Sequence, residues 1–328
     1  MKHTNDLAIA DEISRLSSGS AAPLAAGFLA NGQLERMAVP ASAIDARFEI
    51  GSVTKVFTGT LFAMMVEAGE IDPDAPVDEV IKLRLPWAGC APTLTELAAH
   101  RSGLPNTPGA LWWREAVTAL GWSVKDPWRG VDEAGYQAML ARAVRKAHIG
   151  RRSQYSSMGI GLLGDALAHA SGMTLEELME ERLLAPLGMH RTSFDRPANG
   201  PDRVTLSLNR KGRAVPYLCD HMPAAGMLAS TVDDLIRFVR AALGDGPEVV
   251  VAGIRRAQVP VAEMGGVKVG YCWLIRENER GRVDFHTGGT WGSQSHLSVA
   301  ADRERGAVLL SGTWRDLDRL GGNFVETR

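Results

Sequence analysis

The chain has 328 residues, of which 45% are hydrophobic and 23% are charged, so it is large enough for a sizeable core and ordinary for a globular enzyme. Its 36 basic and 38 acidic residues give a formal net charge of -2. This balance offers no support for binding to nucleic acid or to an anionic membrane.

The same composition bears on the compartment. The cysteines are odd in number and far apart, which argues against a disulfide framework. No apolar run approaches the ~20 residues that a membrane-spanning helix requires. Residues 1–20 begin with Met1 and include Asp6, Asp11 and Glu12, where a signal peptide would need an apolar segment. We therefore expect a cytoplasmic protein without a membrane partner.

The N-terminal region predicts a hairpin followed by a buried helix. Residues 21–30 and 33–39 are strand-like and flank Asn31-Gly32, a strong signal for a hairpin turn. From Ser52 to Gly69 the chain is almost continuously apolar, which predicts a helix that is buried on most sides and stops at the glycine.

Helical patterns dominate the middle of the chain. Capping-box patterns at 93–96 and 174–177 predict a helix over 97–101 and another after Thr174. Residues 136–146 and 158–170 are also expected to be helical. Residues 106–130 are expected to be irregular. Their four tryptophans either line an acyl pocket or fasten this segment to the helices, and the sequence favours neither: Trp112, Trp113, Trp122 and Trp128.

Strand patterns return near the C-terminus. A helix from Thr231 to Leu243 is followed by strand-like runs at 267–275, 282–286, 296–301 and 307–313, whose short links imply an antiparallel sheet. We therefore predict an α+β fold, with an antiparallel sheet flanked by helices and a mostly helical second domain. The predicted sheet domain comprises 1–80 and 200–328, the helical domain comprises 81–199, and the active site is expected at their interface.

Ser52 and Lys55 form the first candidate for chemistry. Residues three apart on a helix share a face, so the two side chains would point the same way. A serine hydroxyl becomes a strong nucleophile when a nearby base takes its proton, and burial can keep a lysine neutral enough to do so. Taken alone, the pattern favours a capping serine followed by a lysine on the surface.

Two later segments could complete such a site. Tyr155 stands just before a helix, beside Ser156 and Ser157, and its phenol could move protons. The run His286-Thr287-Gly288-Gly289 ends a strand, where glycines let a substrate lie against the backbone. Backbone N–H groups there and at Ser52 would form an oxyanion hole.

Metal chemistry is not expected. The cluster Cys219-Asp220-His221 lacks the ligand number and spacing of a zinc site. Arg151 and Arg152 are expected to be a solvated pair, with a substrate-carboxylate role as the alternative. We expect no metal and no cofactor.

Five short motifs occur in an order that resembles the serine β-lactamase and penicillin-binding-protein superfamily, and most closely its class C-like branch of esterases, transesterases and D-amino-acid peptidases. These motifs are Phe48-Glu49-Ile50-Gly51-Ser52-Val53-Thr54-Lys55, Leu97-Ala98-Ala99-His100-Arg101-Ser102-Gly103-Leu104-Pro105, Tyr155-Ser156-Ser157-Met158-Gly159, Pro186-Leu187-Gly188-Met189 and His286-Thr287-Gly288-Gly289.

The resemblance implies a role for each position. Ser52 is similar to the acylated nucleophile, Lys55 to the amine that helps deprotonate it, and Tyr155 to the tyrosine that later protonates the leaving group. Gly289 matches the second oxyanion donor, the first being Ser52. His286 stands where β-lactamases carry the lysine of Lys-Thr-Gly, and its role is either direct or structural.

Two departures from the family pattern bear on the substrate. The family often reads Tyr-x-Asn, whereas the third residue here is Ser157, whose hydroxyl recognises a substrate amide less well than an asparagine does. Histidine at 286 replaces a fixed positive charge with a group expected to titrate near neutrality, which weakens the anchoring of a substrate carboxylate. Both departures favour neutral esters or acyl transfer.

Three hypotheses for function follow. The first is a serine hydrolase that acts through a covalent acyl-enzyme, as an esterase or acyltransferase on a small ester or amide. The second keeps the fold but makes the substrate a D-peptide or a β-lactam. The third is a catalytically silent binding module on the same scaffold, since a fold does not guarantee activity.

Overall fold

The computed structural model describes residues 2–150, 153–195, 200, 203–217 and 220–327. Its strands are β1 Leu24–Ala30, β2 Gln33–Val39, β3 Phe48–Glu49, β4 Ala229–Ser230, β5 Ala262–Met264, β6 Val267–Val269, β7 Leu274–Asn278, β8 Gly281–Gly289, β9 Gln294–Ala300 and β10 Arg305–Ser311. Its α-helices are α1 Lys2–Ser17, α2 Thr54–Glu67, α3 Val77–Ile81, α4 Leu94–Ala98, α5 Trp112–Ala119, α6 Glu133–Val144, α7 Ser157–Ser171, α8 Leu175–Met179, α9 Pro223–Gly226, α10 Val232–Ala242, α11 Glu248–Ala257 and α12 Leu317–Glu326.

A large antiparallel sheet organises the fold, with the strand order β2-β1-β10-β9-β8-β7-β6-β5. The predicted hairpin is confirmed: Leu24 pairs with Val39 and Ala30 with Gln33. Asn31 and Gly32 both have positive φ, the backbone that a tight two-residue hairpin turn requires. The predicted α+β class, with an antiparallel sheet flanked by helices, is confirmed, while the division into domains at 81 and 199 stays a prediction.

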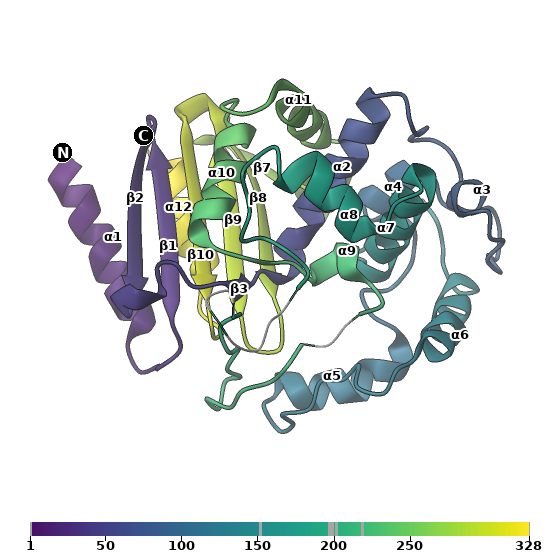
Figure 1. Cartoon of the computed structure of the whole chain (residues 1–328), viewed down its shortest axis with the longest axis horizontal. Helices are drawn as coiled ribbons and strands as arrows, with labels where there is room; N and C mark the ends of the chain where they lie inside the picture. Colours follow the sequence, from purple (N-terminus) through teal and green to yellow (C-terminus); the bar gives the residue numbers. More distant parts are fainter. Residues whose placement is uncertain (1, 151–152, 196–199, 201–202, 218–219, 328) are drawn as a thin grey trace.

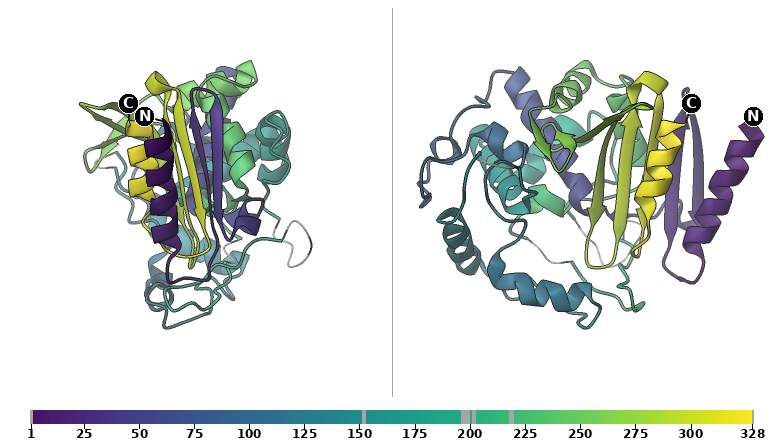
Figure 2. Two further views of the ribbon diagram at one scale, coloured as in Figure 1. Left: turned by 90° about the vertical axis from the view of Figure 1, so that its left-hand side faces the viewer. Right: turned by 180° about the vertical axis from the view of Figure 1, so that it is seen from behind.

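Helices cover both faces of the sheet (Figures 1 and 2). Helices α1 and α12 lie on one face, where α12 contacts β9 and β10 over a small apolar core that includes Phe28 and Leu309. Helix α10 packs on the other face against β1 and β10, and α11 packs along α2. Helices α3, α4, α6 and α7 lie on the side of α2 away from β2, and α5 lies below α2 in the view of Figure 1.

Helix α2 lies at the centre of the main core and is buried along nearly its whole length, from Thr54 to Met65, as the apolar sequence predicts. It contacts α11 on one side and α7 and α9 on others. A side chain at Gly59 would place its Cβ 2.1 Å from the Tyr271 carbonyl oxygen, so glycine permits the close approach of that turn.

Several predicted boundaries are wrong for identifiable reasons. The helix expected at 97–101 is α4, which begins at Leu94 because Thr93 is its N-cap, and both bonds of the capping box form. The single strand expected at 267–275 is two strands, β6 and β7. Residues between them leave the sheet: Tyr271 N–H donates to the Ala257 carbonyl, and Cys272 N–H to the Ala98 carbonyl.

The pattern also missed helices. Helix α5 lies within 106–130, which was expected to be irregular, and α1, α11 and α12 were not predicted. Helices α5, α11 and α12 are amphipathic, so their apolar residues are interrupted by charges such as Arg114 and Glu115. No described helix combines the length and the apolarity needed to cross a bilayer.

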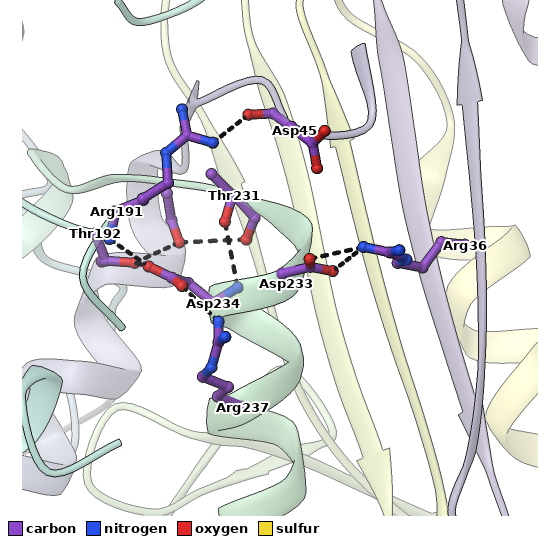
Figure 3. A network of polar contacts seen from close by, with 9 residues as sticks. Arg36, Asp45, Arg191, Thr192, Thr231, Asp233, Asp234 and Arg237 are labelled. Carbon is purple, nitrogen blue, oxygen red and sulfur yellow. Dashed lines mark hydrogen bonds and ion pairs between the residues drawn. The ribbon is translucent and has the colours of Figure 1, made fainter. Parts of the chain in front are cut away.

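A buried polar network fixes the chain near the small β3–β4 pair (Figure 3). The Asp234 carboxylate accepts from Arg191 N–H at 2.8 Å and from the Thr192 hydroxyl at 2.9 Å, and it pairs with Arg237 at 2.8 Å. Thr192 also lies 2.7 Å from the Ser230 hydroxyl. Because Ser230 pairs with Phe48, this network positions the strand that leads directly to Ser52.

Candidate active site

Ser52 and Lys55 lie side by side at the entrance to α2. Ser52 occupies the short turn Gly51–Val53 that connects β3 to the helix, and the Lys55 side-chain nitrogen donates to its hydroxyl at 2.9 Å. The same nitrogen donates to the Ala225 carbonyl at 2.5 Å, and the Lys55 side chain is fully buried. The predicted pairing is therefore present, and the capping role for Ser52 is wrong, since no side-chain cap bond forms there.

Tyr155 joins this pair from a distant part of the chain. Its hydroxyl is hydrogen-bonded to the Ser52 side chain, and its ring centre lies 5.0 Å from the Lys55 nitrogen. Burial raises the pKa of the Tyr155 phenol above its usual range, although the hydrogen bond with Ser52 opposes that rise. The phenol therefore stays protonated at neutral pH.

His100 positions the segment that carries Tyr155. Its ring packs against the Tyr155 ring at 4.6 Å between centres, and its Nδ1 accepts from Ser156 N–H at 3.3 Å. Its carbonyl also accepts from Gln154 N–H. Burial, followed by the nearby Lys55 charge, lowers the pKa of His100 well below its usual value. Sequence reasoning alone does not reveal this role, because residues 100 and 155 are adjacent only in the fold.

His286 lies behind Tyr155, with 6.0 Å between ring centres, and is almost fully buried. Its Nδ1 is 2.6 Å from the Thr287 carbonyl oxygen, so Nδ1 carries the hydrogen and Nε2 keeps a lone pair. Burial, together with the Lys55 charge, lowers the pKa of His286 to about 3. The expectation that this histidine titrates near neutrality is wrong, because the expectation assumed solvent that the fold excludes.

The end of β8 is pressed against the turn that holds Ser52. A Cβ at Gly288 would lie 2.1 Å from the Ile50 carbonyl oxygen and 3.0 Å from the Ser52 nitrogen. A Cβ at Gly51, whose φ is +49°, would lie 2.7 Å from the Gly289 nitrogen. Glycine is thus required on both sides of the contact, and the fold brings the two predicted oxyanion donors, Ser52 and Gly289, to one cavity.

Ser157 is hydrogen-bonded to Asn106, a residue that the sequence did not indicate as part of the site. Its backbone N–H and its hydroxyl both donate to the Asn106 side-chain oxygen, at 3.2 and 2.7 Å. Both residues line the cavity that contains Ser52. The Asn106 carboxamide therefore lies beside Ser157, the position where the family often has asparagine, but Asn106 belongs to the loop after α4.

The cavity over Ser52 measures about 440 Å³. It is lined by Ser52, Asn106, Thr107, Trp112, Glu115, Ala116, Ala119, Trp128, Ser157, Tyr217, Met222, Ala225, Gly289, Thr290, Trp291 and Trp314. Of the four tryptophans in 112–128, Trp128, which is buried, and Trp112, which is exposed, line the cavity. Trp113 and Trp122 are exposed and do not line it. Trp291, Trp314 and Glu115 were not predicted.

Two further predictions concern other polar residues. Arg151, Arg152 and Cys219 lie outside the described residues. His221 is engaged elsewhere, since its Nε2 lies 2.9 Å from the Val131 carbonyl oxygen and its ring stacks on Tyr136. Within the described part of the chain, no group of three or more His, Cys, Asp or Glu side chains is placed to bind a metal ion.

Comparison with known proteins places this geometry in a family. The family model described as Beta-lactamase matches residues 18–323. The D-alanyl-D-alanine-carboxypeptidase/endopeptidase AmpH of Escherichia coli strain K12 is 29% identical over 293 residues, covering 81% of this chain and 71% of the relative. Penicillin-binding protein 4 of Amycolatopsis lactamdurans is 30% identical over 236 residues, covering 66% of this chain and 56% of the relative.

Solved structures share the fold. The D-alanine carboxypeptidase AmpC from Burkholderia cenocepacia superposes with a TM-score of 0.80 at 20% identity, covering 98% of this chain and 99% of that chain. A class C β-lactamase superposes with a TM-score of 0.81 at 18% identity, covering 97% of this chain and 93% of that chain. The family match spans nearly the whole chain and confirms the resemblance seen in the motifs. The chain belongs to the β-lactamase family of serine hydrolases.

Proposed function

We propose that the chain is an esterase or acyltransferase that forms a covalent acyl-enzyme on Ser52. The observation that carries this proposal is the hydrogen-bonded group of Ser52, Lys55 and Tyr155 at the base of one cavity. A nucleophile, a base within hydrogen-bond reach and a third group that orients them is the arrangement that activates a serine.

The proposed first step forms a bond between Ser52 Oγ and the substrate carbonyl carbon. Lys55, in its neutral form, takes the serine proton, and Tyr155 passes it to the leaving oxygen or nitrogen as the acyl bond breaks. The backbone N–H groups of Ser52 and Gly289 stabilise the negative charge that develops on the carbonyl oxygen. Water or an alcohol then attacks the acyl carbon and gives its proton to the same groups. The bond between the acyl carbon and Ser52 Oγ breaks as these groups protonate Oγ, which releases the acid or the new ester.

The neutral state of His286 supports a substrate that carries no negative charge next to the scissile bond. Because its pKa is lowered to about 3, His286 is neutral at working pH and offers no fixed charge for a carboxylate next to the scissile bond. Its role is proposed to be positioning, since its ring packs near Tyr155. No cofactor is needed for these steps.

The relatives favour a second candidate. AmpH is named as a D-alanyl-D-alanine carboxypeptidase and endopeptidase, and the same set of groups could cleave a D-peptide amide or a β-lactam. Asn106 supports this candidate, since its carboxamide stands at the cavity wall where it could bind a substrate amide.

A substrate panel separates the two candidates. We expect p-nitrophenyl acetate and butyrate to be hydrolysed with a burst of p-nitrophenol, and Ser52→Ala to lose this activity. Ser18→Ala, which removes an exposed hydroxyl at the end of α1, is the matched control. Turnover of a D-alanyl-D-alanine peptide or of a chromogenic cephalosporin, with esters left intact, would instead establish the second candidate.

A further inference from the structure

The cavity over Ser52 has an unusual balance of charge and aromatic surface. Among its described lining residues, Glu115 is the only one that carries a formal charge, and no lysine or arginine lines it. Five aromatic side chains also line it: Trp112, Trp128, Tyr217, Trp291 and Trp314. A carboxylate among aromatic rings is an environment that favours a cation, because the ring faces are electronegative.

The aromatic wall is fixed by specific contacts. Asp126, itself buried, accepts from the indole N–H of Trp291 at 2.9 Å and from the backbone N–H of Trp128 at 2.6 Å, which ties two separate segments together. Trp112 and Glu115 are three residues apart on α5 and so share one face of that helix. Asp126 therefore holds Trp128 and Trp291 in place, while α5 carries Trp112 and Glu115 on one face.

Glu115 has spare capacity to accept hydrogen bonds. Its Oε2 accepts from the Thr107 hydroxyl at 2.7 Å, whereas its Oε1 is buried and has no hydrogen-bond partner among the described residues. Burial, followed by the nearby Asp126, raises the pKa of Glu115, opposed by the Thr107 hydrogen bond. A buried carboxylate oxygen without a partner is costly, and a bound cation would offset that cost.

Two positive charges lie near the cavity but outside its described lining. Lys55 is engaged with Ser52 and Ala225 below the cavity. Arg210 lies over the Trp314 ring, 5.7 Å from its centre, and lines a neighbouring cavity that shares Trp314. An acyl donor with a carboxylate would meet Glu115 and no described lining cation.

We propose that this cavity selects acyl donors whose acyl chain carries a cationic ammonium group, which the tryptophans surround and Glu115 pairs. This inference rests on the proposed acyl transfer at Ser52 and names the class of substrate that the site prefers. Neutral donors still react, because the bond-making groups are separate from Glu115.

Two esters of equal shape test the preference. One is p-nitrophenyl 4-(trimethylammonio)butanoate, and the other is p-nitrophenyl 5,5-dimethylhexanoate, in which carbon replaces the charged nitrogen. We expect wild type to favour the cationic ester by about tenfold in kcat/KM, the size of a desolvated cation–π contact joined to a charge pair. Glu115→Gln is expected to reduce that ratio to below about threefold. Glu176→Gln, which removes an exposed carboxylate on α8, should leave the ratio unchanged.

Equal use of the two esters by wild type, or an unchanged ratio in Glu115→Gln, would overturn the inference. A second readout does not depend on turnover: calorimetric titration of Ser52→Ala with 4-(trimethylammonio)butanamide and with 5,5-dimethylhexanamide. We expect the charged amide to bind about tenfold more tightly, and the difference to shrink when Glu115→Gln is added. If neither ester is hydrolysed, the proposed function fails, and the titration alone decides whether the cavity prefers a cation.

Discussion

Replacing Tyr155 with phenylalanine should separate proton transfer from packing. The ring contacts with His100 at 4.6 Å, His286 at 6.0 Å and the Lys55 nitrogen at 5.0 Å are retained, because phenylalanine keeps the ring. Only the hydroxyl that bonds to Ser52 is lost. Ser52 keeps its 2.9 Å bond from Lys55, so the free energy of unfolding should change by no more than about 1 kcal/mol.

Activity should fall far more than stability. General acid–base catalysis by a positioned side chain contributes roughly 10²- to 10⁴-fold, so kcat/KM for a methyl or ethyl ester should drop by about that factor. The loss should be smaller for a p-nitrophenyl ester, because p-nitrophenolate departs without first receiving a proton whereas an alkoxide needs one.

The assay is therefore a comparison of leaving groups. Hydrolysis of an alkyl ester and of a p-nitrophenyl ester with the same acyl group is measured for wild type and Tyr155→Phe, and unfolding by urea is followed for both. The reasoning is refuted if both esters lose activity equally, or if the alkyl ester is unaffected. A large loss of stability would show instead that the hydroxyl has a structural role.

Three other predictions follow from the same geometry. Lys55→Met keeps an unbranched apolar stem but removes the amine that acts as the base, so labelling of Ser52 by a fluorophosphonate should become slower by at least about 100-fold, measured by gel fluorescence; equal labelling would exclude Lys55 as the base. The pKa of His286 is about 3 in the folded protein and about 6.5 in the unfolded chain. As the pH falls, the unfolded chain therefore takes up this proton at a higher pH than the folded protein does. The free energy of unfolding should therefore keep the full contribution of neutral His286 above pH 6.5 and fall toward pH 3, with a loss of about 2 kcal/mol at pH 5. In urea titrations, the free energy of unfolding of His286→Gln should decrease less over this range. Gly288→Ala should lower the free energy of unfolding by more than about 2 kcal/mol, because the added Cβ would meet backbone at 2.1 Å, whereas Gly89→Ala meets nothing within 4 Å and should change little by the same measurement.

The sequence predicted those parts of the fold where local signals are strong. The Asn31-Gly32 turn and the apolar run of α2 each follow from a short stretch of chain, and both are present. The two strands β6 and β7 were merged because the turn at Cys272 is fixed by hydrogen bonds to α4 and α11, which local patterns cannot reveal.

In the candidate site too, some contacts follow from local sequence or motif order, and others depend on segments that meet only in the fold. The spacing of Ser52 and Lys55 predicted their contact, and motif order predicted that Tyr155 would join them. The contact of Asn106 with Ser157 and the place of Glu115 in the cavity depend on segments that meet only after folding. The neutral state of His286 likewise depends on burial, which a residue type alone does not specify.

The most direct test of the account is the mass of the protein during turnover. Wild type mixed with a slowly deacylating p-nitrophenyl ester and quenched with acid should gain the mass of one acyl group, and fragmentation of the proteolytic peptides should place that group on Ser52. An acyl group mapped to any other residue, or steady hydrolysis by Ser52→Ala, would contradict the assignment of Ser52 as the nucleophile.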